Sequence, residues 1–244
     1  YLSKSKYWHA IEHDLNERSI KVYDLCEETV RCDATTVSGY HKVKEGGVMQ
    51  FGHSKDDADL PQIKVMTGSL DPLGMPLATD VVPGQRADDG LYIPLIDRID
   101  SGLKNSGLLF VGDCKMSALE TRAYINARRH YYLSPLPLTG SVAIDKEEWI
   151  SIGIEKEEAD ELESVWKKND RGQEVLAAKG YEFERVQQRE EEELEWNERV
   201  LVINSPAYRE RQSAGLEKRL GNARKKIESL TPPRGRGKRQ ITEE

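Results

Sequence analysis

The residues most suited to chemistry are two aspartates, one inside a stretch that is typical of a β-strand and the other at the end of such a stretch. Asp33 lies in VRCDATTVSGYH (residues 30–41), and Asp113 follows the apolar run GLLFV. A β-branched strand is expected to be half-buried, where an ionised carboxylate is costly unless a charged or hydrogen-bonding group meets it. If the two strands are neighbours, both carboxylates enter one site. Spacing alone does not distinguish such a pair from aspartates that form turns or cap helices.

Paired carboxylates on rigid strands are suited to Mg²⁺ or Mn²⁺. Mg²⁺ typically takes one or two carboxylates and completes its shell with water and substrate phosphate. Two such ions about 4 Å apart activate an oxygen nucleophile and stabilise the leaving oxygen of a phosphodiester. Asp33 and Asp113 are therefore the candidate metal ligands and catalytic residues.

Basic residues near these positions and at the end of the sequence are candidates for contacts with DNA phosphates. Lys115 comes two residues after Asp113, and Lys55 lies in GHSKDD. The glycine-spaced segment RGRGKRQ supplies a salt-sensitive, sequence-independent affinity for a polyanion through Arg234, Arg236, Lys238 and Arg239. The alternatives are a polar strand end for Lys55 and an ordinary solvated linker for the tail.

The elements that must position the two aspartates follow a recognisable order. A helix is expected at about Tyr7–Arg18 and another at about 89–103, where Leu91, Leu95, Ile99 and Leu103 share one face and Asp88 or Asp89 caps the start. A third helix, capped by Ser117, is expected over 117–129. Strands are expected at 29–40, 48–53, 63–69, 75–82, 107–113 and within YYLSPLP. The order predicts an α/β fold in which helices pack against a mixed sheet.

The composition changes after Gly140. Residues 141–200 are strongly acidic and residues 205–239 strongly basic, an asymmetry that hints at a surface facing a polyanion. We expect an acidic helix at about 155–170 and a hairpin, or alternatively a helix, around Glu190–Glu193. A helix begins at Ser205-Pro206 and carries a coiled-coil-like seam formed by Leu216, Leu220, Ala223, Ile227 and Leu230. The expected divisions are residues 1–28, 29–140, 141–204 and 205–244.

The overall composition excludes some classes of protein. The sequence has 244 residues, 37% hydrophobic and 32% charged, with a net charge of −7. No apolar run approaches the length of a membrane span, so we expect a cytoplasmic protein with no membrane partner. Three cysteines without CxxC spacing are expected to be reduced thiols, with Cys114 packed in the core. Because the first residue is Tyr1, we expect the sequence to be part of a longer chain.

Four blocks resemble the DDE transposases of bacterial insertion sequences. They are DATTVSGYHK, QFGHSKDDADLPQIKV, DPLGMPLATDVVPGQRADD and LLFVGDCKMSALETRAYI, in family order over about residues 29–140. The match is closest to the subgroup whose catalytic domain is interrupted, and SPAYRERQSAGLEKRL resembles that insertion. The resemblance implies an RNase H-like sheet with flanking helices, interrupted by an α+β insertion that contains the long helix. It also implies divalent metal, DNA cleavage and strand transfer at element ends, a homodimer or larger assembly on DNA, and Asp33 and Asp113 as two catalytic carboxylates.

This sequence departs from the family's pattern at the third catalytic carboxylate. The family places a Glu in a Tyr-x2-Arg-x3-Glu-x6-Lys helix, whereas here Tyr208 and Arg211 are followed by Gly215 and Asn222 at the Glu and Lys positions. We expect this segment to be a decoy and the true Glu to lie beyond Glu244. Two alternatives to a transposase that cleaves and joins DNA stay open: a non-catalytic remnant that binds DNA or a partner, and an RNase H-like nuclease.

Overall fold

The computed structural model describes residues 5–53, 57–103, 105–189 and 193–230, which form two compact units. The first unit contains Tyr1–Val142 and Gln187–Trp196, and the second contains Ala143–Val186 and Asn197–Glu244. No helix in the described part of the chain is both long and apolar enough to cross a bilayer.

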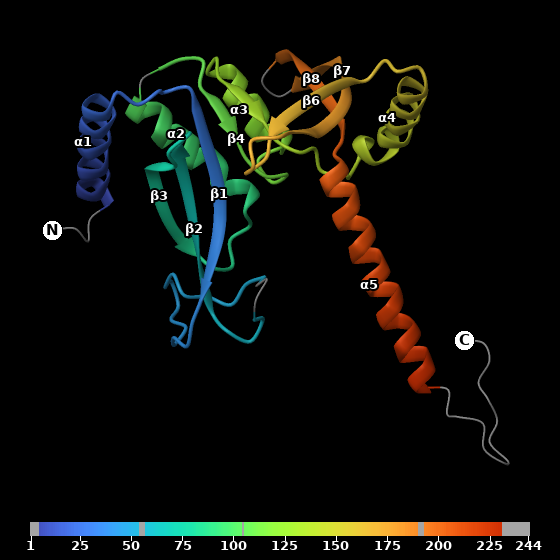
Figure 1. Ribbon diagram of the computed structural model, residues 1–244. Helices are drawn as coiled ribbons and strands as arrows, with labels where there is room; N and C mark the ends of the chain where they lie inside the picture. Colours follow the sequence, from blue (N-terminus) through green and yellow to red (C-terminus); the bar gives the residue numbers. More distant parts are fainter. Residues whose placement is uncertain (1–4, 54–56, 104, 190–192, 231–244) are drawn as a thin grey trace. The chain divides into compact units, whose positions relative to one another are not determined.

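A five-stranded mixed sheet forms the centre of the first unit (Figure 1). Its spatial order is β3-β2-β1-β4-β5, with the strands β1 (Thr29–Ser38), β2 (Gln62–Leu70), β3 (Met75–Pro83), β4 (Leu109–Val111) and β5 (Tyr131–Leu133). The pairs β1–β2 and β2–β3 are antiparallel, and the pairs β1–β4 and β4–β5 are parallel. This arrangement confirms the predicted RNase H-like α/β fold, with β1 at the centre of the sheet.

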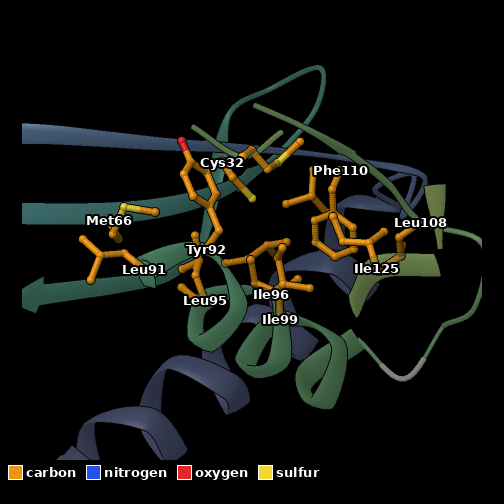
Figure 2. Close-up of a cluster of buried hydrophobic side chains, with 14 of the residues drawn as sticks. Cys32, Met66, Leu91, Tyr92, Leu95, Ile96, Ile99, Leu108, Phe110 and Ile125 are labelled. Carbon is orange, nitrogen blue, oxygen red and sulfur yellow. The ribbon is translucent and has the colours of Figure 1, made fainter. Parts of the chain in front are cut away.

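Helices cover the sheet through one apolar core (Figure 2). They are α1 (Ser5–Tyr23), the 3₁₀ turn η1 (Asp89–Leu91), α2 (Tyr92–Leu103) and α3 (Leu119–Ala127). Leu91, Leu95 and Ile99 are buried, as their spacing of four predicts, and Val30 and Cys32 of β1 face the same core. Gly68 of β2 leaves room for Ile99, because a Cβ at residue 68 would lie 2.3 Å from Ile99 Cδ1.

Helix α1 is attached to this core by polar contacts. The guanidinium of Arg98 on α2 pairs with Glu12 on α1 and with Asp80 on β3. The Glu12 carboxylate also accepts a hydrogen bond from the Thr79 amide, at 3.2 Å. Arg98 therefore joins two helices and a sheet edge through groups that are largely shielded from solvent.

The second unit has its own small sheet, ordered β6-β7-β8, with α4 packed on it. The elements that lie wholly or mostly in this unit are α4 (Ser141–Glu158), β6 (Glu163–Lys168), β7 (Glu174–Arg189), β8 (Leu194–Asn204) and α5 (Pro206–Leu230). Trp149 of α4 packs against Phe183 of β7, and its carbonyl accepts a 2.7 Å hydrogen bond from the Tyr181 hydroxyl. The neighbouring strands β7 and β8 confirm the predicted hairpin. The helix predicted to begin at Ser205-Pro206 is α5, and at its start the Ser205 hydroxyl accepts a 3.5 Å hydrogen bond from the Tyr208 amide.

Several sequence-based expectations were wrong. Residues 48–53 form no strand, and Gln50 makes only an isolated bridge to Gln62. The helix expected at 155–170 ends at Glu158, and the β-branched and aromatic run that follows forms β6.

Three expected side-chain positions were also wrong. Asp88 occupies the N-cap position of η1, but its carboxylate makes no capping hydrogen bond and pairs with Lys64 instead. Ser117 does not cap α3, whose N-cap residue is Ala118. Cys114 is exposed instead of packing in the core.

Candidate active site at the ends of strands β1 and β4

Asp33 lies on β1, and Asp113 follows β4, the parallel neighbour of β1. Parallel pairing of β1 with β4 joins Thr29 to Leu109, Val30 to Phe110 and Arg31 to Val111. The same offset along the chain relates Asp33 to Asp113, which lies two residues beyond the end of β4. The negative charges of both aspartates act on the Tyr92 phenol, so both carboxylates lie near its hydroxyl.

Asp33 does not occupy the half-buried environment that its β-branched neighbours suggested. Side chains alternate along β1, so that Cys32 is buried and Asp33 is exposed on the opposite face, as is Arg31. One Asp33 oxygen, Oδ1, accepts the Ala34 amide at 2.9 Å. The carboxylate is therefore solvated and needs no cation to be tolerated, while it remains accessible to one.

Asp113 is held more firmly. Its Oδ1 accepts a 2.7 Å hydrogen bond from the Tyr92 hydroxyl and a 2.8 Å hydrogen bond from the Lys115 amide. The Tyr92 ring is fully buried beside Cys32, and Figure 2 shows its hydroxyl oxygen at the edge of the cluster. Burial, the hydrogen bond to Asp113 and the negative charges of Asp113 and Asp33 raise the pKa of Tyr92. The phenol therefore stays protonated and donates.

The turn that carries Asp113 is also constrained from two other directions. A Cβ at Gly112 would lie 2.6 Å from Met116 Sδ and 2.9 Å from Met116 Cβ. Lys115 is half-exposed, and its Nζ lies 3.5 Å from Asp89 Oδ1. The turn is thus closely packed inside and tied to the segment that precedes α2.

The donor set fits the ion that the sequence predicts. Two carboxylates are what Mg²⁺ usually takes from a protein, and both side chains here are accessible. Over the described ranges, no group of three or more His, Cys, Asp or Glu side chains is placed to hold a metal ion. Tyr208 and Arg211, the two residues of the decoy signature, are exposed on α5.

The remaining predicted DNA contacts are those of Lys55 and of the basic tail. Lys55 and the tail residues Arg234, Arg236, Lys238 and Arg239 lie outside the residues that the structure describes.

Sequence reasoning missed Tyr92 and Lys64. Tyr92 falls between Leu91 and Leu95 of the predicted apolar face and reads as one more core residue, and only the fold reveals its bond to Asp113. Lys64 is buried in β2, where its Nζ donates to the Arg86 carbonyl and to Asp88. An isolated lysine in a strand gives no signal in the sequence that it anchors the loop before α2.

None of the residues of helix α5 is buried, and its Lys and Arg side chains lie on several faces. Residues seven apart on a helix lie about 20° apart, so Arg211, Lys218 and Lys225 form one line. Glu210 and Glu217 form another line, which Glu228 continues. The apolar seam is exposed, with Leu216 at 51% and Ile227 at 61%. The basic line therefore lies apart from the three glutamates of the helix.

No protein-family model matches the chain, and no curated protein matches it. Among solved structures, it is similar to a piggyBac transposase synaptic complex with hairpin DNA, with a TM-score of 0.36 and 8% identity over 46% of this chain and 23% of that chain. It is also similar to a Mos1 transposase paired-end complex with left transposon end, with a TM-score of 0.32 and 9% identity over 59% of this chain and 53% of that chain. A third similar structure is a simian T-cell lymphotropic virus intasome in complex with PP2A regulatory subunit B56 gamma. Its TM-score is 0.30, with 9% identity over 56% of this chain and 42% of that chain.

The chain therefore spans between 23% and 53% of the length of these three structures. At such identities and TM-scores the likeness carries no argument about activity. The functional conclusion depends on the residues of this chain.

Proposed function

We propose that this chain is part of a DDE-type DNA transposase in which Asp33 and Asp113 hold Mg²⁺ or Mn²⁺. The observation that carries the proposal is that Asp33 and Asp113 each follow the last pair of the parallel β1–β4 ladder, Arg31 and Val111, by two residues. The order of the four sequence blocks supports it, since the two aspartates are the residues that those blocks assign to catalysis.

The residues of the site have distinct proposed roles. Asp33 and Asp113 provide oxygen ligands from a rigid sheet, and their exposure lets a DNA backbone approach them. The bound metal would supply activation of the attacking oxygen and stabilisation of the leaving oxygen at the scissile phosphate. Lys115, whose side chain is 52% exposed, lies beside Asp113 and is placed to contact a phosphate.

Plasmid cleavage tests this proposal. The full chain is incubated with supercoiled plasmid and Mg²⁺ or Mn²⁺, alongside Asp33→Asn, Asp113→Asn and the control Asp170→Asn, which alters an exposed aspartate of the second unit. We expect any metal-dependent nicking to be equal in the wild type and the control and at least about 100-fold lower in either site variant, since two-metal chemistry depends on both ligands. Nicking that survives in both site variants would contradict the proposal.

Two alternatives predict different results in the same assay. Cleavage without joining of a donor 3′ end to a target would identify a nuclease. Salt-sensitive DNA binding without any cleavage would identify a non-catalytic DNA-binding chain. The excess of basic residues on α5, seven Lys or Arg against three Glu, favours the second alternative over a chain with no DNA contact.

A further inference from the structure

Tyr92 joins the apolar core to the turn that carries Asp113. Its ring is 0% exposed and lies at the first residue of α2, while its hydroxyl donates to an oxygen of an exposed carboxylate. The helix start is itself fixed, because buried Lys64 binds the Arg86 carbonyl and the Asp88 carboxylate just before it. The position of the phenol oxygen is therefore set by the rigid part of the fold.

The two hydrogen bonds at Asp113 distinguish its two oxygens. Each carboxylate oxygen has about two lone-pair sites. On Oδ1 both are occupied, one by the Tyr92 hydroxyl and the other by the Lys115 amide. The other oxygen, Oδ2, is the one left for an incoming cation in the described part of the chain.

We infer that Tyr92 is a positioning residue that fixes the Asp113 carboxylate so that Oδ2 is its metal-binding oxygen. This inference rests on the proposed metal site and adds to it a residue that no transposase block of the sequence singles out. Groups that hydrogen-bond to a metal ligand orient it, and their removal typically lowers metal affinity by about 10–100-fold. Without the phenol, the Asp113 side chain would be held through the Lys115 amide alone.

The chain offers a matched control. The Tyr124 hydroxyl donates a 2.8 Å hydrogen bond to Asp97 Oδ1, a carboxylate on the helix α2 and not on the Asp113 turn. Tyr124→Phe and Tyr92→Phe each remove one hydroxyl from one tyrosine–carboxylate pair. A general loss of stability would weaken Mn²⁺ binding in both variants, whereas loss of the positioning hydrogen bond would weaken it only in Tyr92→Phe.

The experiment is a Mn²⁺ titration of the full chain, followed by electron paramagnetic resonance of free Mn²⁺. We expect Asp113→Asn to abolish the site, Tyr92→Phe to raise the Kd by about 10-fold or more, and Tyr124→Phe to leave it within about twofold of wild type. Equal Kd values for Tyr92→Phe and wild type, with Asp113→Asn inactive in binding, would overturn the role of Tyr92 and leave the metal site intact. Binding that is unchanged in Asp113→Asn would overturn both.

A second measurement covers the case in which Tyr92→Phe does not fold. Incorporating 3-fluorotyrosine at position 92 keeps the ring and the hydroxyl, and its ¹⁹F resonance reports on the hydrogen bond to Asp113. We expect Mg²⁺ to shift this resonance in a saturable manner, and to leave the resonance of 3-fluorotyrosine at position 124 in place. A resonance at position 92 that Mg²⁺ does not move, in a chain shown to bind Mn²⁺, would overturn the inference.

Discussion

Arg31 and Val111 are the last pair of the parallel β1–β4 ladder, and Asp33 and Asp113 each lie two residues further along the chain. One carboxylate is on a central strand and exposed, and the other is on a turn and held by Tyr92 and Lys115. Asp113 is thus the more rigid ligand and Asp33 the more adjustable one, a combination that suits a cation that must exchange waters for substrate oxygens. This relationship is the basis of the proposed function.

Gly112→Ala should disturb the Asp113 turn. The new Cβ would meet Met116 Sδ at 2.6 Å and Met116 Cβ at 2.9 Å, so the turn or the methionine must shift. We expect a loss of about 1–3 kcal/mol in the free energy of unfolding, as for overpacked sites, and weaker Mn²⁺ binding. The control is Gly90→Ala, where a Cβ meets nothing within 4 Å; equal effects of the two changes in urea unfolding would contradict the packing argument.

Arg98→Met should destabilise the first unit. The change leaves Glu12 and Asp80, both shielded from solvent, without their shared guanidinium. We expect a cost of about 2 kcal/mol, between the values for exposed and for buried pairs. Arg31→Met is the comparison, because Arg31 pairs with Asp71 while its own side chain is 62% exposed. Thermal unfolding should show the larger loss for Arg98→Met, and the reverse order would count against this account of how α1 is attached.

Cys32 should make stability fall at alkaline pH. Burial raises the pKa of this thiol from 9.0 to about 12. As the pH rises from 9.0 towards 12, the unfolded chain releases the proton while the folded chain retains it, so folding stability decreases over this range. Cys32→Ala should reduce that slope, whereas Cys114→Ala, at an exposed thiol, should not. Urea unfolding between about pH 8 and pH 11 measures both slopes, and identical slopes in wild type and Cys32→Ala would refute the prediction.

The basic line of α5 should contribute to DNA affinity if the second unit contacts the phosphate backbone of DNA. Replacing Arg211, Lys218 and Lys225 by Gln removes three charges from one face. We expect the slope of log K against log salt to fall by up to about 2.7, since each phosphate contact contributes about 0.9. The control double variant Arg209→Gln with Arg224→Gln, whose side chains lie off this line, should change the slope by less than about 1. Fluorescence anisotropy with a duplex measures both, and equal slopes per charge removed would indicate a non-specific effect of net charge.

The sequence predicted the sheet well because strand signals and apolar periodicity are local. The strands around Asp33 and before Asp113, and the buried face of Leu91, Leu95 and Ile99, were all identified from spacing. The pairing of Asp33 with Asp113 depended on a guess of strand adjacency, which no local pattern encodes.

The misses have a common physical cause. Asp88 and Ser117 both have good capping chemistry, yet tertiary contacts decided otherwise: Lys64 pairs with Asp88, and α3 starts after Ala118. Tyr92 looked like a core residue, and its hydroxyl gained a partner only when the Asp113 turn was placed beside it. Contacts between distant segments of the chain are not visible in the composition of either segment.

Anomalous diffraction from Mn²⁺-soaked crystals of the chain tests the central claim most directly. We expect either one Mn²⁺ peak about 2.1 Å from a carboxylate oxygen of both Asp33 and Asp113, or two peaks. In the second case each carboxylate would have an oxygen about 2.1 Å from the nearer ion. On Asp113 that oxygen should be Oδ2. Peaks only at other sites, or carboxylates more than about 8 Å apart, would contradict the proposed metal site.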